Sequence, residues 1–263
     1  MKYGFIGLGN MATAIIKGMI LSTSYDSKGI LGYDPYSKAG RDLASDMGIR
    51  VCASLAELAA ADVLVLAVKP QTLPEVMREL RPLNISGKLV ISIAAGRSLA
   101  VLQEGLGHGM AIVRVMPNIN AKVGAATSAF AANGNCGEEQ KIIVDALFST
   151  IGTILELPEE QFAVFTAIAG CSPAFSYMYI DALARAAVRR GIPKAKALEI
   201  AASSVYGSAK MILETREHPF ALIDQVSSPG GTTVEGVCAL QEHGFESAVH
   251  KAVEAAVMKD KVL

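Results

Sequence analysis

Apolar runs of strand length alternate with helical patterns along residues 1–156. The run at 63–68 is continuously apolar, which is typical of a parallel strand buried on both faces. Between the runs, apolar residues recur at helical spacing, as in 11–21 and 38–47. The alternation predicts βαβ units and a parallel sheet with right-handed crossovers. The strand-like runs are 2–8, 29–33, 63–68, 88–94 and 111–116.

The pattern changes after residue 156. Leu157-Pro158-Glu159-Glu160 has the proline and the acidic residues that are typical of a first helical turn. From there to Leu263 the chain shows helical spacing and no strand pattern, which predicts an α/β domain at 1–156 and an all-helical domain at 157–263. The expected helices are 159–170, 173–190, 194–215, 219–226, 232–243 and 245–260.

The amino-acid composition of the chain is unusually apolar. Hydrophobic residues make up 51% of the 263 residues and charged residues 19%. This excludes disorder and indicates either a membrane protein or a protein that buries more than one monomer's core. The charge-free stretch 162–180 is long enough to span a bilayer, but it contains Gly170, Pro173 and small polar residues. We therefore expect a buried helix pair, broken near Gly170 and Pro173, and no membrane partner.

Charge and cysteine content restrict the possible binding partners and the cellular compartment of the protein. Lys and Arg number 24 against 25 Asp and Glu, whereas proteins that bind a nucleic-acid backbone normally carry a basic excess. Four cysteines lie far apart without a C-x-x-C pair, and the chain opens without a signal-peptide pattern. We expect a cytoplasmic protein with no nucleic-acid partner, no disulfide framework and no metal site.

The motif Gly7-Leu8-Gly9-Asn10-Met11-Ala12 follows the first predicted strand and opens the first predicted helix. In this G-x-G-x-x-A pattern Gly7 allows a tight turn, Gly9 lets the backbone approach a pyrophosphate, and Ala12 permits close helix–strand packing. The helix N-terminus presents free N–H groups to the anion. The pattern in this context predicts that these six residues bind a dinucleotide.

Two further segments lie where such a cofactor binds. Asp34, at the end of the second predicted strand, could accept hydrogen bonds from the adenosine ribose and would repel a 2′-phosphate, which favours NADH. Ser37, Lys38 and Arg41 follow closely and could hold a 2′-phosphate, so NADPH stays open. Ala67-Val68-Lys69-Pro70 ends the buried strand at 63–68, and Lys69 is a candidate phosphate or ribose contact.

A second glycine-containing motif is Ser228-Pro229-Gly230-Gly231-Thr232-Thr233. Thr232 and Glu235 have capping-box spacing, which predicts a helix start. The helix N-terminus and the two hydroxyls could bind a carboxylate, although an ordinary capped helix explains the same residues.

Together with Arg114-Val115-Met116-Pro117-Asn118, these motifs resemble the pyrroline-5-carboxylate reductase family over essentially the whole chain. The resemblance implies a Rossmann-type dinucleotide-binding domain followed by an all-helical dimerisation domain. It implies NADPH- or NADH-dependent reduction of a cyclic imine, 1-pyrroline-5-carboxylate, to L-proline, the last step of proline biosynthesis. It also implies a homodimer, which several members of the family assemble into a ring of dimers.

The resemblance also assigns roles to residues. Thr232 and Thr233 match the family's substrate-binding positions, and we expect Ser228, Gly230 and Gly231 to bind the substrate with them. From the chemistry of the reaction we expect the Thr233 hydroxyl to be the catalytic group, as the hydrogen-bond partner or proton donor of the imine nitrogen. Ser54, Ile93, Ala94 and Ala95 would join Ala67, Val68, Lys69 and Pro70 in binding the cofactor. The chain departs from the family at Gly170-Cys171-Ser172-Pro173-Ala174-Phe175, where Gly-Ser-Gly-Pro-Ala-Tyr is common, and at Ile119-Asn120, where Thr-Pro is usual.

Three alternatives remain. A β-hydroxyacid dehydrogenase has the same domain plan but carries a Gly-x-x-x-Lys-x-x-Asn pattern. In this chain Lys210 follows Gly207 at the wrong spacing, and Leu213 stands where the asparagine belongs, which argues against it. A reductase of another cyclic imine would carry the same motifs. A non-catalytic NAD(P)-binding regulator would keep the first motif without needing the second.

Overall fold

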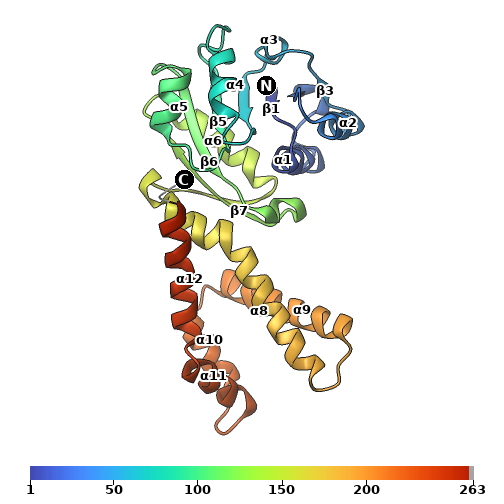
Figure 1. Cartoon of the computed structure of the whole chain (residues 1–263), viewed down its shortest axis with the longest axis vertical. Helices are drawn as coiled ribbons and strands as arrows, with labels where there is room; N and C mark the ends of the chain where they lie inside the picture. Colours follow the sequence, from blue (N-terminus) through green and yellow to red (C-terminus); the bar gives the residue numbers. More distant parts are fainter. Residues whose placement is uncertain (261–263) are drawn as a thin grey trace. The chain divides into compact units, whose positions relative to one another are not determined.

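The structure, a computed structural model, describes residues 1–260. Contacts divide these residues into a first unit, Met1–Gly170, and a second unit, Cys171–Met258. The first unit contains an eight-stranded sheet in the order β3-β2-β1-β4-β5-β6-β7-β8 (Figure 1). Its strands are β1 Tyr3–Ile6, β2 Ile30–Tyr33, β3 Arg50–Val51, β4 Val63–Leu66, β5 Leu89–Ser92, β6 Ala111–Met116, β7 Ala126–Ala132 and β8 Gly152–Glu156.

Strand register brings several predicted site segments to one edge of the sheet. Ile6 at the end of β1 lies opposite Tyr33 of β2 and Leu66 of β4, and Leu66 lies opposite Ser92 of β5. The residues that follow these strand ends therefore start side by side. They include Gly7, Asp34, Ala67 and Ile93.

Helices cover both faces of the sheet because strand residues alternate between two apolar cores. Phe5 joins the core with α1 (Asn10–Leu21), α2 (Lys38–Asp46) and α6 (Glu138–Ser149). Its neighbour Ile6 joins the core with α3 (Leu55–Leu58), α4 (Leu73–Leu80) and α5 (Leu99–Leu106). This is the doubly wound arrangement that the alternating pattern predicts, and it confirms the α/β fold class.

The five predicted strands pair parallel, as expected, and the sheet also contains one antiparallel pair that the sequence did not indicate. β7 pairs antiparallel with β6, because the chain returns through the short 3₁₀ helix η2 (Ile119–Val123), too short for the crossover of about a dozen residues that parallel strands need. β3, β7 and β8 were not predicted. β3 has only two residues, β7 is rich in alanine, and β8 alternates weakly, so none carries a strong apolar signal. The predicted domain boundary after residue 156 coincides with the end of the last strand, β8, at Glu156. The division into compact units falls later, after Gly170.

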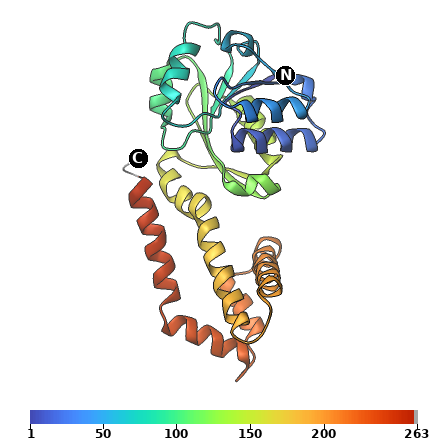
Figure 2. The ribbon, with the colours of Figure 1, turned by 45° about the vertical axis from the view of Figure 1, so that its right-hand side comes forward.

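The second unit is helical throughout its described residues. The predicted bounds of three helices match at both ends, and the others agree within two residues. The helices are α8 Ser172–Val188, α9 Lys194–Thr215, α10 Pro219–Val226, α11 Thr232–Glu242 and α12 Phe245–Asp260 (Figure 2). Their buried core is small: among the described residues, the fully buried apolar cluster of this unit consists of Ala184, Ala197 and Ala201, where α8 packs on α9.

The expected break near Gly170 and Pro173 is wrong, and the expected burial at 162–180 is only partial: Phe162 and Ala169 are buried, whereas Met178 is exposed. Glu159–Val188 forms one helical run of 30 residues that passes through a π-helical turn, η4 (Thr166–Cys171), without ending. Pro173 falls in the first turn of α8, and because it has no N–H it cannot donate to the Ala169 carbonyl four residues earlier. By length and composition this run could cross a membrane, and only 17% of its most apolar window is buried.

An apolar groove of about 470 Å³ separates α8 from α12. Tyr179 and Phe245 approach across it, with ring centroids 5.9 Å apart. Large apolar side chains such as Met178 line the groove, and others are exposed elsewhere on the unit. A unit with a three-alanine core and this much exposed apolar surface requires a partner surface. A second copy of the chain would explain the apolar composition.

We expect Met178→Glu to weaken association of the chain with itself. Met178 is 76% exposed in the single chain, and a carboxylate at an interface would have to lose its water. Sedimentation should show more monomer, and the melting temperature, which rises with protein concentration when a dimer is the folded form, should fall by several degrees. Leu21→Glu, at a 70% exposed position of α1, is the control and should change neither. A wild-type chain that stays monomeric with a concentration-independent melting temperature would contradict this account.

Candidate functional site

The turn after β1 can be formed only by glycine at residue 7. Gly7 has φ +93, and a Cβ added there would lie 2.7 Å from the Ala67 carbonyl oxygen. Its N–H donates to the Tyr33 carbonyl oxygen at 2.8 Å. The turn therefore sits where the ends of β1, β2 and β4 meet, as the G-x-G pattern requires.

Open space lies above the N-terminus of α1. Gly9 is the N-cap of this helix and no side chain caps it. A Cβ at Gly9 would meet no protein atom within 4 Å, whereas Ala12 is buried against the core. The first N–H groups of α1 thus face a space that a side chain at residue 9 would occupy. This cradle fits the pyrophosphate of a dinucleotide.

A cavity of about 540 Å³ adjoins this turn. It is lined by Gly7, Gly9, Asp34, Tyr36, Ser37, Ala67, Val68, Lys69 and Thr72. Most of these are predicted cofactor-binding residues or candidates, so the fold brings three sequence-distant segments together. Tyr36 and Thr72 were missed. Each lies shortly after the end of a strand, which is the only signal that could have indicated them.

A smaller cavity of about 170 Å³ continues past Tyr33, Glu75 and Glu79. Burial raises the pKa of the Tyr33 hydroxyl above its usual value, and the nearby Glu79 carboxylate raises it further. The Tyr33 hydroxyl is therefore protonated at neutral pH and can act as a hydrogen-bond donor.

The Asp34 carboxylate is bound by backbone amides. Its Oδ2 accepts from the Leu8 N–H at 2.9 Å, and its Oδ1 accepts from Tyr36 and Ser37 at 2.9 and 2.8 Å. Asp34 is only 9% exposed. It therefore ties the phosphate-binding turn to the loop after β2, a role that was not predicted. Arg41 donates to the Asp34 carbonyl oxygen at 2.5 Å, so this candidate for a 2′-phosphate contact already has a partner.

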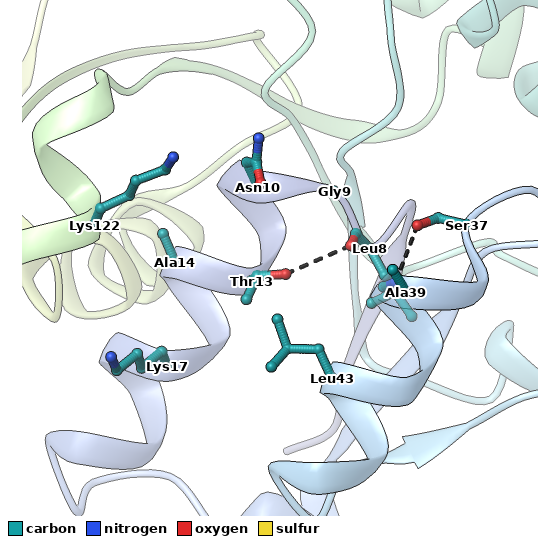
Figure 3. Close-up of a pocket in the computed structure, with 11 residues that line it drawn as sticks. Leu8, Gly9, Asn10, Thr13, Ala14, Lys17, Ser37, Ala39, Leu43 and Lys122 are labelled. Atoms are coloured by element: carbon teal, nitrogen blue, oxygen red, sulfur yellow. Dashed lines mark hydrogen bonds between the residues drawn. The ribbon is translucent and has the colours of Figure 1, made fainter.

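A groove of about 390 Å³ runs over the outer side of α1, between α2 and η2 (Figure 3). Lys17 of α1 and Lys122 of η2 lie on one side, and Ser37, which caps α2 by accepting from the Gly40 N–H at 3.0 Å, lies on the other. Asn10 and Thr13 stand between them. The two lysines make the surroundings of the turn favourable to an anion.

Other predicted cofactor residues lie outside the linings of these three cavities. Ser54 caps α3 by accepting from the Glu57 N–H at 3.3 Å. Ile93, Ala94 and Ala95 follow β5, and Ala94 is buried. Pro70 follows Lys69 and accepts a hydrogen bond from Arg97 at 3.2 Å. Their contact with a cofactor stays a prediction.

The motif 228–233 forms a tight turn within the second unit. Gly230 has φ +67, and the Gly231 N–H donates to the Ser228 carbonyl oxygen at 2.9 Å. Helix α11 begins at Thr232 as predicted, but its N-cap is Gly231 and no side chain caps it, so the predicted capping box is wrong. The helix leaves this end open because Thr232 is already inside the first turn. Thr233 is exposed, while the Ser227 hydroxyl is buried without a hydrogen-bond partner among the described residues.

Within residues 1–260, no three His, Cys, Asp or Glu side chains lie close enough together to hold a metal ion. The four cysteines are all free thiols.

Two family models match the chain. Residues 159–263 match the model described as pyrroline-5-carboxylate reductase dimerisation. Residues 2–96 match the model described as NADP oxidoreductase, coenzyme F420-dependent. The two matches follow the predicted order of a dinucleotide-binding part and a helical dimerisation part.

Relatives cover the whole chain. A pyrroline-5-carboxylate reductase of Methanosarcina acetivorans is 41% identical over 263 residues, covering 100% of this chain and 97% of the relative. The Escherichia coli enzyme of that name is 40% identical, covering 100% and 98%.

Solved structures agree with these relatives. The Plasmodium falciparum pyrroline carboxylate reductase with NADP bound has a TM-score of 0.88 at 32% identity, covering 100% of this chain and 97% of that one. The Coxiella burnetii enzyme has a TM-score of 0.93 at 32% identity, covering 99% and 97%. A prephenate dehydrogenase of Aquifex aeolicus, at 18% identity and a TM-score of 0.54, shares the fold alone.

We expect Gly9→Ala to impair NADPH binding and Gly7→Ala to impair the stability of the fold. Gly9→Ala should fold with an unchanged melting temperature, because its methyl group meets no protein atom, yet it should bind NADPH at least about tenfold more weakly by filling the pyrophosphate space. Gly7→Ala should lower the melting temperature itself, because its methyl group would clash with Ala67. Calorimetry of binding and thermal melts measure both. Normal NADPH binding by Gly9→Ala would remove the pyrophosphate from this turn.

We expect Asp34→Asn to affect both stability and cofactor preference. An amide offers one acceptor oxygen where the carboxylate offers two, so a buried N–H loses its partner at a cost of about 1–3 kcal/mol in the free energy of unfolding. Loss of the negative charge should also shift the ratio of dissociation constants towards NADPH. Asp42→Asn, on the exposed side of α2, is the matched control. An unchanged ratio would show that Asp34 has no part in choosing the cofactor.

Proposed function

The chain belongs to the pyrroline-5-carboxylate reductase family, and we propose that it reduces 1-pyrroline-5-carboxylate to L-proline with NADPH or NADH as the hydride source. The observation that carries this proposal is full-length similarity to reductases of that name, in a chain whose Gly7 turn has the open cradle a dinucleotide needs. Membership in this family argues against the alternative that the chain is a β-hydroxyacid dehydrogenase. Because the relatives are named as reductases, membership also argues against a non-catalytic NAD(P)-binding regulator.

The first unit would bind the cofactor through its own backbone and a few side chains. The N–H groups at the start of α1 would hold the pyrophosphate, and Asp34 would keep the turn in place. Lys69 and Ser37, which both line the larger cavity, would contact the phosphates or the adenosine ribose. The bound nicotinamide supplies a hydride. The remaining predicted contacts are Ser54, Pro70, Ile93, Ala94 and Ala95.

The motif in the second unit would bind the substrate. The uncapped N–H groups at the start of α11 favour a carboxylate, and Gly230 and Gly231 leave the backbone accessible, with Ser228 and Thr232 as neighbouring hydroxyls. The imine carbon receives the hydride and its nitrogen ends protonated. The Thr233 hydroxyl would hydrogen-bond that nitrogen. Since an aliphatic hydroxyl is a weak acid, Thr233 would orient and polarise the imine, and orientation can supply much of the rate.

We propose the same assembly and compartment for this chain as its sequence predicts. A homodimer would cover the apolar groove between α8 and α12, and dimers could associate further into a ring. A reducing cytoplasm would suit four free thiols. The predicted domain 1–156 would then bind the cofactor. The predicted domain 157–263 would carry dimerisation and substrate binding.

The direct test is loss of NADPH or NADH absorbance on addition of racemic 1-pyrroline-5-carboxylate. Turnover is expected with at least one cofactor. A parallel reaction with the six-membered cyclic imine homologue tests the alternative substrate class. A folded chain that binds NADPH and consumes neither imine would overturn the proposal and favour a regulator.

Thr233→Val should lower kcat/KM about 10–10³-fold, the loss typical of one positioned donor. Thr233→Ser keeps a hydroxyl and should recover most of that loss. Thr215→Val, at an exposed threonine near the end of α9, is the control and should be indistinguishable from wild type. Wild-type kinetics in Thr233→Val would remove Thr233 from the mechanism.

A further inference from the structure

Asn118 joins three segments that are distant in sequence. It follows β6 and is 5% exposed. Its Nδ2 donates to the Ala169 carbonyl oxygen at 2.9 Å. Its Oδ1 accepts from the N–H groups of Asn120 and Thr127, at 3.3 Å each. One amide side chain thus holds its own loop, the start of β7 and the helical run that begins at Glu159.

The Ala169 carbonyl lies in an unusual part of that run. Residues Thr166–Cys171 form a π-helical turn, whose wider hydrogen-bond spacing interrupts the α-helical ladder. Ala169 is buried, and the residue four positions on is Pro173, which has no N–H to donate, so the Ala169 carbonyl needs another partner. Asn118 supplies that partner. Such turns occur frequently at functional sites.

A second set of contacts from β6 fixes the start of the same run. The Arg114 guanidinium pairs with Glu159 at 2.9 Å and lies 4.5 Å from the centre of the Phe162 ring. The same Glu159 oxygen accepts from the Leu99 N–H, at the start of α5, at 2.8 Å. The first three turns of the run are therefore held at both ends by residues in or just after β6.

Strand order places this loop at the reacting end of the cofactor. A dinucleotide crosses the carboxyl edge of the sheet where the order reverses, here between β1 and β4, with its adenosine on the β2 side. The nicotinamide half then points towards β4, β5 and β6. The end of β6 is three strand spacings from β1, about 14 Å. Met116 at that end lies against the π turn, since a Cβ on Gly170 would be 3.6 Å from its terminal methyl group.

We propose that Asn118 is a positioning residue for hydride transfer. By holding the Ala169 carbonyl it fixes the Met116-Pro117-Asn118 loop and the π turn as one rigid unit at the reacting end of the cofactor. Because it touches neither pyrophosphate nor adenosine contacts, its loss should slow the reaction without weakening cofactor binding. The inference rests on the proposed reductase function.

Asn118→Asp tests this because it replaces the donor to Ala169 with a carboxylate oxygen and keeps an acceptor for the two N–H groups. The carboxylate can still accept from Asn120 and Thr127, but it cannot donate to Ala169. Asn133→Asp is a matched control. Asn133, 7% exposed at the opposite end of the β6–β7 pair, accepts from Ile112 and Asn135 and donates to Met110 at 2.9 Å. The same change there breaks an equivalent bond far from the carboxyl edge.

Asn118→Asp should lower kcat about 10–100-fold, as a misplacement near 1 Å does, while the NADPH dissociation constant stays within about threefold. Asn133→Asp should lose similar thermal stability and keep wild-type kcat. Equal effects on kcat in both variants, or no effect in Asn118→Asp, would overturn the inference. If Asn118→Asp does not fold, Asn118→Ser, whose shorter side chain cannot reach Ala169, takes its place. A wild-type chain without turnover would instead count against the proposed function.

Discussion

The bond between the Asp34 carboxylate and the Leu8 N–H is the contact on which the cofactor site depends. It connects the turn after β1 to the loop after β2, while Gly7 packs against the Ala67 carbonyl after β4. Three strand ends are thereby fixed around the uncapped start of α1. The cavity that results is bounded by backbone and small side chains, which leaves its shape to the sheet register. Cofactor binding is thus a consequence of how β1 lies between β2 and β4.

Local features of this site could be predicted, and long-range ones could not. The G-x-G-x-x-A turn and the flanking strand and helix are encoded within residues 2–21, so sequence was sufficient for them. The Asp34 contact requires knowing that β1 and β2 are neighbours, and Asn118 reaches a carbonyl 51 residues away. The alanine-rich β7 and the two-residue β3 carry too little apolar signal to be identified as strands. The capping box failed because Gly231, one residue earlier, starts the helix.

The helical unit is governed by a different constraint, which is the apolar surface that a single chain leaves exposed. Its helices were predicted closely because clear breaks separate them in the sequence. Burial could not be predicted in the same way, since large apolar side chains of α8 such as Tyr177 and Met178 are exposed in the single chain. A core of three alanines leaves most apolar side chains of α8 and α12 on the surface. Association of two chains, as proposed above, would then be part of folding for this unit and would explain a composition that is 51% hydrophobic. Family membership, with a matching dimerisation model, agrees with this physical argument.

Hydride transfer from a nicotinamide to a cyclic imine leaves an isotopic mark on the product. The most direct measurement is mass spectrometry of the product formed from 1-pyrroline-5-carboxylate and NADPH carrying deuterium at both C4 positions. We expect L-proline that contains one deuterium, at ring carbon 5, in an amount equal to the NADPH consumed. Proline without deuterium, or NADPH consumption without proline, would contradict it.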